Sequence, residues 1–204
     1  MPRRRVTPRR AGIRSIGPRF PNPWARHNRL VRELRRSSSI ELLLDPDAEA
    51  AVRAEWDALA AIGLSSLAGH TSASNRPHLT LVARIDLPAP RPRVFAGIGS
   101  FPVTLGAPLL FGTGERRVLA RSVVPTAELL DLRARVHAAV GPGEDAPHTA
   151  PGEWMPHVAL ARRLRVADLP AALDLLGGDI RGRAAIVRHW HAADAVVTDV
   201  ATLL

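Results

Sequence analysis

Hydrophobic residues recur with two different spacings along the chain, and both patterns begin near residue 40. Short apolar runs bounded by turn residues predict β-strands. These runs lie at residues 40–44, 78–84, 101–105, 117–124, 155–163, 184–191 and 195–203. Longer segments with apolar residues three or four apart predict helices. Their inward faces are Val52, Trp56 and Leu59 in the first helix, Leu129, Leu132, Val136 and Val140 in the second, and Leu169, Leu173 and Leu176 in the third. The pattern therefore predicts an α+β protein.

Each predicted helix also has a start signal and a stop signal. Asp45, Thr126 and Asp168 stand at the three N-cap positions, where a side-chain oxygen accepts a hydrogen bond from a free backbone N–H. Glycines, which favour helix C-termini, follow the three helices at Gly63, Gly141 and Gly177. With these boundaries a strand–helix–strand order recurs in both halves of the chain, which is typical of two similar lobes related by a pseudo-twofold axis.

The strongest chemical signal is a short pattern that occurs twice. Residues 76–84 read Arg-Pro-His-Leu-Thr-Leu-Val-Ala-Arg, and residues 155–163 read Met-Pro-His-Val-Ala-Leu-Ala-Arg-Arg. Side chains alternate faces along a strand, so His78 shares a face with Thr80, as His157 does with Ala159. Two such strands side by side would aim two imidazoles into one cleft. A neutral and a protonated histidine form an acid–base pair that works near pH 7.

This double pattern resembles that of the 2H phosphoesterases, specifically the bacterial 2′-5′ RNA ligase-like group, which is marked by two His-x-Thr/Ser-x motifs. The first motif, residues 78–81, matches in full, whereas the second, residues 157–160, has Ala159 at the hydroxyl position. The histidines are 157 − 78 = 79 residues apart, a separation typical of the group. The resemblance covers residues 39–204. It implies a bilobal α+β fold, in which two pseudo-symmetric lobes with antiparallel sheets line a central groove and the helices lie outside.

The resemblance also implies a reaction and the residues that perform it. The expected activity is metal-independent hydrolysis of a 2′,3′-cyclic phosphate or a 2′-5′ linkage in RNA or a nucleotide, with no cofactor. We assign His78 as the acid and His157 as the base, although the near symmetry of the motifs leaves the order of these roles open. Thr80 and Arg162 would bind the phosphate oxygens. Ala159 lacks the expected hydroxyl, so a weakly active enzyme, or a protein that only binds RNA ends or nucleotides, stays an alternative.

Several other residues have both a functional and a structural interpretation. Trp154, just before the second motif, could stack a nucleobase or belong to the core. His189 and His191 share a strand face and could bind a metal, but no third ligand is near in sequence, so an aromatic cluster is favoured. His137 lies off the apolar face of its helix, and we expect it to be solvated.

Charge is distributed unevenly along the chain. All 28 basic residues are arginine, and residues 1–38 hold 12 of them with a single acid, Glu33, for a net charge of +11. Residues 39–204 hold 28 − 12 = 16 arginines and 19 − 1 = 18 acids, for a net charge of −2. Phosphate recognition by the folded part must therefore rest on a few placed arginines rather than on a broad basic field.

These patterns divide the chain into a basic Arg/Pro-rich tail at residues 1–38 and a domain at residues 39–204. The composition of the tail favours disorder or an artefact of start-site choice. If the tail instead binds RNA, the domain could be only a scaffold, which is a third class of function. No apolar run approaches 18 residues, so we expect no membrane span. The absence of cysteine excludes disulfides and fits an intracellular protein, and we expect a cytoplasmic monomer.

Overall fold

The structure of the protein, a computed structural model, describes residues 37–70, 72 and 74–203. Its strands are β1 (Ser38–Leu44), β2 (His78–Arg84), β3 (Pro102–Phe111), β4 (Arg116–Val123), β5 (His157–Arg165), β6 (Ile180–His191) and β7 (Val196–Thr202). Its helices are α2 (Pro46–Ala61), α3 (Ala127–Val140) and α4 (Leu169–Asp174), with 3-10 turns η1 (Pro92–Phe95) and η2 (Val166–Asp168). Each predicted strand and helix is present. Residues 1–36 of the predicted tail lie outside the described residues, and β1 begins at Ser38.

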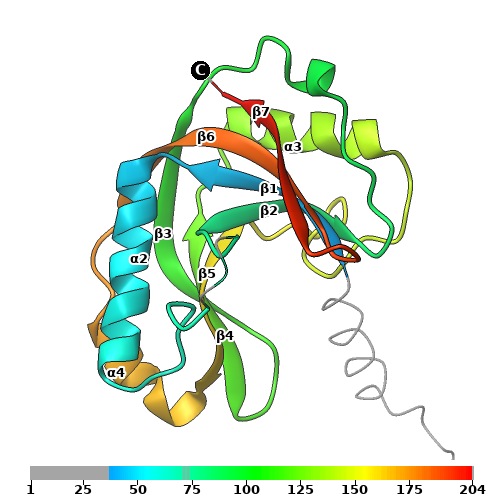
Figure 1. Ribbon diagram of the computed structural model, residues 1–204. Coiled ribbons are helices and arrows are strands. Elements are labelled where there is room, and N and C mark those ends of the chain that lie inside the picture. The colour runs from blue at the N-terminus through cyan, green and yellow to red at the C-terminus, as the bar shows by residue number, and fades with distance from the viewer. Residues whose placement is uncertain (1–36, 71, 73, 204) are drawn as a thin grey trace, which may run out of the picture.

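The strands form two antiparallel halves that share β6 (Figure 1). One half has the order β2-β1-β6-β7 and the other has the order β5-β4-β3-β6. Residues 180–183 of β6 pair with β3, whereas the rest of the strand pairs with β1 and β7. The strands β2 and β5 are therefore the inner edges of the two halves, where they meet at Leu79 and Val158. This arrangement is the predicted bilobal α+β fold.

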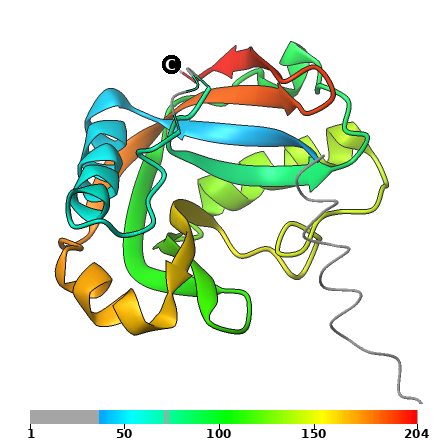
Figure 2. The same cartoon turned by 60° about the horizontal axis from the view of Figure 1, so that its bottom comes forward.

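The two long helices cover the sheets from outside (Figures 1 and 2). The strand before each helix belongs to one half of the sheet, and the helix packs on the other half. Helix α2 follows β1 but packs against β5 and β6, and α3 follows β4 but packs against β2. Asp45 caps α2 by accepting a hydrogen bond from the Ala48 N–H at 2.9 Å, as predicted. The Trp56 indole donates to the Ala159 carbonyl at 3.0 Å, which fixes α2 directly behind the second motif.

The predicted inward faces of the first two helices are buried, except that Val140 at the end of α3 is only partly buried. Trp56 is 2 % exposed, and Val52 and Leu59 are fully buried beside it. On α3, Leu129, Leu132 and Val136 are buried. All six side chains belong to one apolar cluster that includes the even-numbered residues Leu42 and Leu44 of β1, together with Leu79, Leu81, Val158 and Leu160 of the two motif strands. The motif strands are therefore rigidly supported from the face opposite to their histidines.

The prediction for the third helix was wrong in its length and in its cap. Helix α4 ends at Asp174, Ala172 is its one buried residue, and Leu173 is 38 % exposed. Asp168 does not cap it, because both carboxylate oxygens accept hydrogen bonds from Arg165 at 2.7 Å. The short helix is thus a connector between β5 and β6 rather than a third covering helix.

The prediction that His137 is solvated was also wrong. Its Nε2 lies 2.8 Å from Asp145 Oδ2, and Arg84 donates to the other oxygen of Asp145 at 2.5 Å. Arg84 also donates to the Gly141 carbonyl at 2.8 Å. This polar cluster joins β2, α3 and the loop at residues 141–156 that leads into the second motif. It is buried, because Arg84 and Asp145 each expose only 4 % of their side chains.

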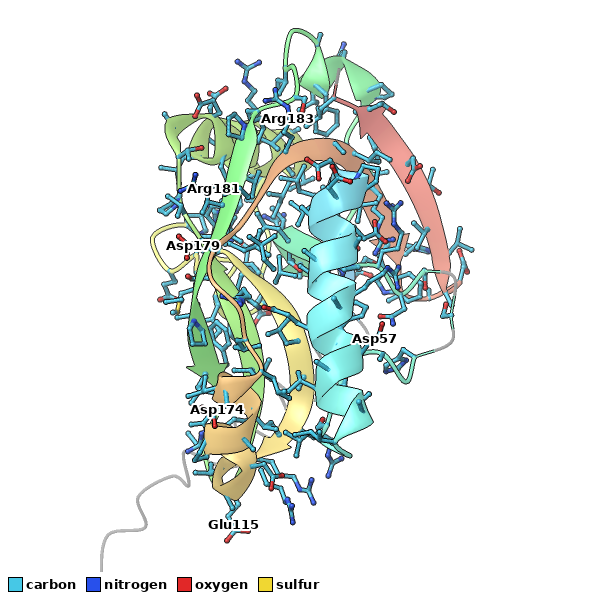
Figure 3. All side chains as sticks on the ribbon, turned by 90° about the vertical axis from the view of Figure 1, so that its left-hand side faces the viewer. Asp57, Glu115, Asp174, Asp179, Arg181 and Arg183 are labelled. Carbon is cyan, nitrogen blue, oxygen red and sulfur yellow. The ribbon has the colours of Figure 1, made fainter. Side chains whose placement is uncertain are left out.

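The outer side of the molecule carries charges of both signs (Figure 3). Asp57 on α2 and Asp174 on α4 are exposed there, as are Arg181 and Arg183 near the start of β6. Such a mixed surface does not form a basic field for RNA. None of the helices in the described part of the chain is both long enough and apolar enough to span a membrane.

Candidate active site

The two motifs meet where the inner edges of the two halves touch. Leu79 pairs with Val158 in antiparallel register, so Thr80 lies across from His157 and His78 lies across from Ala159. All four flanking side chains are therefore on one face of the paired strands. Diagonal neighbours in such a pair are about 7–8 Å apart, so one phosphate can fit between the two imidazoles. Each of the four is partly exposed.

The two imidazoles are held in the same way by the chain that precedes them. His78 Nδ1 lies 2.8 Å from the Arg76 carbonyl, and His157 Nδ1 lies 2.7 Å from the Met155 carbonyl. A carbonyl can only accept, so Nδ1 carries a proton in both rings and Nε2 is the free position. The ring of the proline before each histidine fixes the backbone angle φ of that proline. The same Pro-His step therefore gives the same ring orientation twice.

Glu41 is a site residue that the sequence analysis missed. It lies across from Thr80 on β1, and its Oε1 is 3.6 Å from His78 Nε2. Arg188 and Ser39 donate to its carboxylate at 2.8 and 2.6 Å. Burial alone would raise the pKa of Glu41, but His78, Arg188 and Ser39 together hold this pKa below its ordinary value. An ionised carboxylate therefore faces the Nε2 atom of His78.

Different surroundings act on His157. Its ring packs on Phe111 with a centroid separation of 4.5 Å, and Phe111 in turn contacts His148 at 5.0 Å. Burial lowers the pKa of His157, and the nearby His148 and His78 lower it further, against the opposing hydrogen bond to Met155. His157 is therefore neutral at pH 7, with a free lone pair on Nε2. The two histidines of a symmetric pattern thus occupy unlike electrostatic environments.

Two hydroxyl groups flank His157, one from each side. Thr80 lies across from it on β2, and Ser122 pairs with it on β4. Neither hydroxyl makes a hydrogen bond to another side chain or to the backbone within the described residues. Ala159, which occupies the position in the second motif that corresponds to Thr80 in the first, has no hydroxyl to donate. Ser122 was not predicted, because only the pairing of β4 with β5 brings it beside the motif.

The other predicted phosphate ligand, Arg162, is exposed on β5 and makes no ion pair or hydrogen bond in the described part of the chain. A bulge lies between His157 and Arg162, since Ala159 pairs with Ala120 but Ala161 pairs with Leu119. The bulge changes the alternation of faces along β5. Arg162 is therefore a free guanidinium on the motif strand, and its part in phosphate binding stays a prediction.

Trp154 and the pair of C-terminal histidines have mainly structural surroundings. The Trp154 indole donates to the Thr80 carbonyl at 3.0 Å, and the Arg133 guanidinium lies over its ring at 4.9 Å. His189 and His191 have ring centroids 5.9 Å apart, but His189 contacts the Leu87 carbonyl and His191 contacts Asp194. No cluster of three or more metal-binding side chains occurs among the described residues.

The fold therefore has two antiparallel half-sheets with a motif histidine on each inner edge. The sequence pattern of the 2′-5′ RNA ligase superfamily matches residues 46–201. The chain therefore belongs to that superfamily, the 2H phosphoesterases. No curated protein matches the chain in sequence.

One solved structure supports the same fold. The structure of Usb1 from Kluyveromyces marxianus matches with a TM-score of 0.51 and 12 % identity, over 81 % of this chain and 97 % of that protein. The same protein with uridine monophosphate matches with a TM-score of 0.48 and 12 % identity, over 81 % and 98 %. At this identity the likeness concerns the fold.

Proposed function

We propose that the protein is a metal-independent phosphodiesterase that hydrolyses a 2′,3′-cyclic phosphate or a 2′-5′ linkage in RNA or nucleotides. The observation that carries this proposal is the matched presentation of two imidazoles on paired strands. Each donates from Nδ1 to the carbonyl two residues before it, and each presents Nε2 to the same face. Membership of the 2H family supports the same assignment.

The unlike surroundings of the histidines support one order of roles. Neutral His157 removes a proton from the attacking water through Nε2, as the water oxygen forms a bond to phosphorus. His78, which faces the ionised Glu41 carboxylate, gives its Nε2 proton to the ribose oxygen as the phosphorus–oxygen bond of the ring breaks. One proton is taken and one is given, so the pair only needs exchange with solvent to return to its starting state.

Donors beside the histidines stabilise the charge that grows on the phosphate oxygens. Thr80 and Ser122 offer hydroxyls on either side of His157, and Arg162 offers a free guanidinium further along β5. Two hydroxyls are thus present although the second motif lacks its own. This arrangement favours an active enzyme over a protein that only binds phosphate.

The experiment is a screen of the purified protein against 2′,3′-cyclic nucleotides and RNA that ends in a cyclic phosphate, with and without a chelator. We expect hydrolysis that the chelator does not change. His78→Ala and His157→Ala should remove nearly all of it, because each acid or base role is worth about 10²–10⁴-fold. Turnover that vanishes with chelator and returns with a divalent cation would contradict the proposal.

Ala159 motivates a second candidate, a non-catalytic protein that binds RNA ends or nucleotides. The test is a titration with a nucleoside monophosphate under conditions in which no cyclic phosphate is hydrolysed. Tight binding that depends on His78 and His157, without turnover of any substrate in the screen, would favour this candidate. Turnover by the wild-type protein excludes it.

A further inference from the structure

An aromatic row lies at the His157 end of the motif strands. It consists of His148, Phe111 and His157, with successive ring centroids 5.0 and 4.5 Å apart. The three rings come from three different places: the loop before β5, the end of β3 and the start of β5. Figures 1 and 2 show how β3 bends along its length and ends in the hairpin turn that leads to β4. The bend carries Phe111 toward the motif.

Exposure distinguishes this row from ordinary core packing. Of the phenylalanines in the described part of the chain, Phe95 and Phe101 are each only 5 % exposed. Phe111 is half-buried, and His148 is exposed. The hairpin end carries a second exposed apolar side chain, Leu110, at 45 %. An aromatic surface is thus open to solvent directly beside the imidazole that would act on the phosphate.

The backbone at His148 supports a functional role for this surface. His148 has φ of 63°, in the left-handed region that non-glycine residues rarely adopt. Such strain persists where the surroundings enforce it, and it concentrates at ligand sites. The loop that carries His148 is fixed by the buried cluster of Arg84, Asp145 and His137. The imidazole is therefore held at the surface by a rigid support and does not relax into the core.

We propose that Phe111 and His148 form a platform on which a nucleobase of the substrate stacks while its phosphate lies between the two motif histidines. This inference rests on the proposed function and narrows its substrate to a nucleotide or an unpaired RNA end. Unstacked bases bind to the faces of Phe and His rings, and this contact is tolerant of base identity. The platform replaces Trp154, whose indole N–H is used by the Thr80 carbonyl and whose ring is covered by Arg133.

A second hollow borders the site at the His78 end, but it fits a base less well. Its lining includes Arg76, Arg188, Ser74 and Asp199, and no aromatic residue is among the described residues that line it. Both arginines are already paired, Arg76 with Glu49 and Arg188 with Glu41. The aromatic row is the surface whose chemistry matches a base.

The test compares a 2′,3′-cyclic nucleoside monophosphate with methyl riboside 2′,3′-cyclic phosphate, which lacks the base. Phe111→Leu keeps an apolar side chain but removes the ring. His148→Asn removes the imidazole and tolerates the left-handed backbone. Leu110→Ala, on the same hairpin end, is the matched control. For both ring variants we expect KM for the nucleotide to rise about 5- to 150-fold, the range for one lost base–aromatic stack. KM for the base-free substrate should rise less than KM for the nucleotide, because any effect through His157 acts on both substrates alike.

An equal rise in KM for both substrates would contradict the platform, because Phe111 and His148 would then act only through His157. A nucleotide KM unchanged in both ring variants would overturn it as well. If the wild-type protein hydrolyses no cyclic phosphate, the proposed function fails. The platform is then tested separately, by calorimetric titration with uridine 3′-monophosphate and with ribose 3-phosphate. The platform requires tighter binding of the nucleotide, with the difference lost in Phe111→Leu. Equal affinities for the two ligands in the wild-type protein would exclude it.

Discussion

His78 and His157 have nearly identical sequence contexts but opposite electrostatic neighbours, and this contrast predicts the pH dependence of turnover. His157 has a pKa below the ordinary value of 6.5 because of its burial and its imidazole neighbours. It stays neutral until the pH falls through that lowered pKa, so the acidic limb of kcat/KM should lie below pH 6.5. At high pH, activity should fall because the acid of the pair must carry a proton. A bell-shaped profile with its acidic limb above pH 6.5 would contradict this assignment.

Glu41→Gln should lower kcat. The substitution keeps the shape of the side chain but removes the carboxylate that lies 3.6 Å from Nε2 of His78, the proposed acid. It also leaves Arg188 as an unpaired buried charge, at a cost of about 3–5 kcal/mol in the free energy of unfolding. The double variant Glu41→Gln, Arg188→Gln removes that charge, so kcat can be measured in a folded protein. Arg188→Gln alone retains Glu41 and should lower kcat less than the double variant does.

Ala159→Thr should raise kcat. The side chain shares a face with His157, at the position that carries a hydroxyl in the first motif. A recovered oxyanion donor is worth up to about 10²–10³-fold in kcat, while substrate binding should change less, since the donor acts mainly as charge develops. Steady-state kinetics on the folded variant measure the gain. An unchanged kcat would mean that Ser122 or Arg162 already donates to the phosphate oxygens. Ser122→Ala, made in the wild-type protein and in the Ala159→Thr variant, shows which of the two residues does so.

At the scale of elements, the loop at residues 141–156 depends on a buried ionic cluster rather than on secondary structure. Arg84 on β2 and His137 on α3 both bind Asp145. Burial would raise the pKa of Asp145, but hydrogen bonds and charge from Arg84 and His137 hold it below its ordinary value of 3.8. Arg84 belongs to β2, and the loop that carries Asp145 leads directly into β5. The cluster therefore connects both inner strands through one carboxylate.

Asp145→Asn should destabilise the protein by about 3–5 kcal/mol at pH 7, since it leaves Arg84 buried without its partner charge. A group with a lowered folded pKa contributes its full stability above its unfolded pKa. That contribution is lost as the pH falls through the folded pKa. The difference in unfolding free energy between wild type and variant should thus shrink as the pH falls below 3.8. Urea unfolding across this range measures it, with Asp131→Asn on the exposed side of α3 as the control.

At the scale of the whole molecule, the excess positive charge lies in residues 1–36, outside the residues that the structure describes. Residues 1–36 carry the whole excess of +11, whereas the core begins at β1. Ser38 belongs to the domain, because it is 2 % exposed and its hydroxyl accepts a hydrogen bond from the Ala192 N–H. A protein that begins at Ser37 therefore keeps every residue of the sheets.

Removal of residues 1–36 should leave the melting temperature and the turnover of a small cyclic nucleotide unchanged. If the segment binds RNA, the truncation should weaken RNA binding at low salt in a sequence-independent way and reduce its salt dependence. Calorimetry, kinetics and filter binding at two salt concentrations measure the three quantities. Loss of folding would show that these residues complete the domain.

The sequence alone determined the elements, their order and the two motif histidines. Strand and helix periods, the Asp45 and Thr126 caps and the repeated Pro-His step are local signals, and each acts through residues a few positions apart. The third helix was misjudged, because Arg165, three positions earlier, binds the Asp168 carboxylate that was expected to cap the helix. The family followed from the repeated motif and its spacing.

Only the tertiary structure decided what surrounds each histidine. Glu41 stands inside an apolar run and was read as part of a strand, and Phe111 and Ser122 are distant from the motifs in sequence. These residues reach the site through strand pairing across β1, β4 and β5 and through the bend of β3. Pairing and bending depend on which strands pack together, which is a property of the whole core. The repeated motif therefore made the site nearly symmetric in sequence, and packing made it asymmetric in charge.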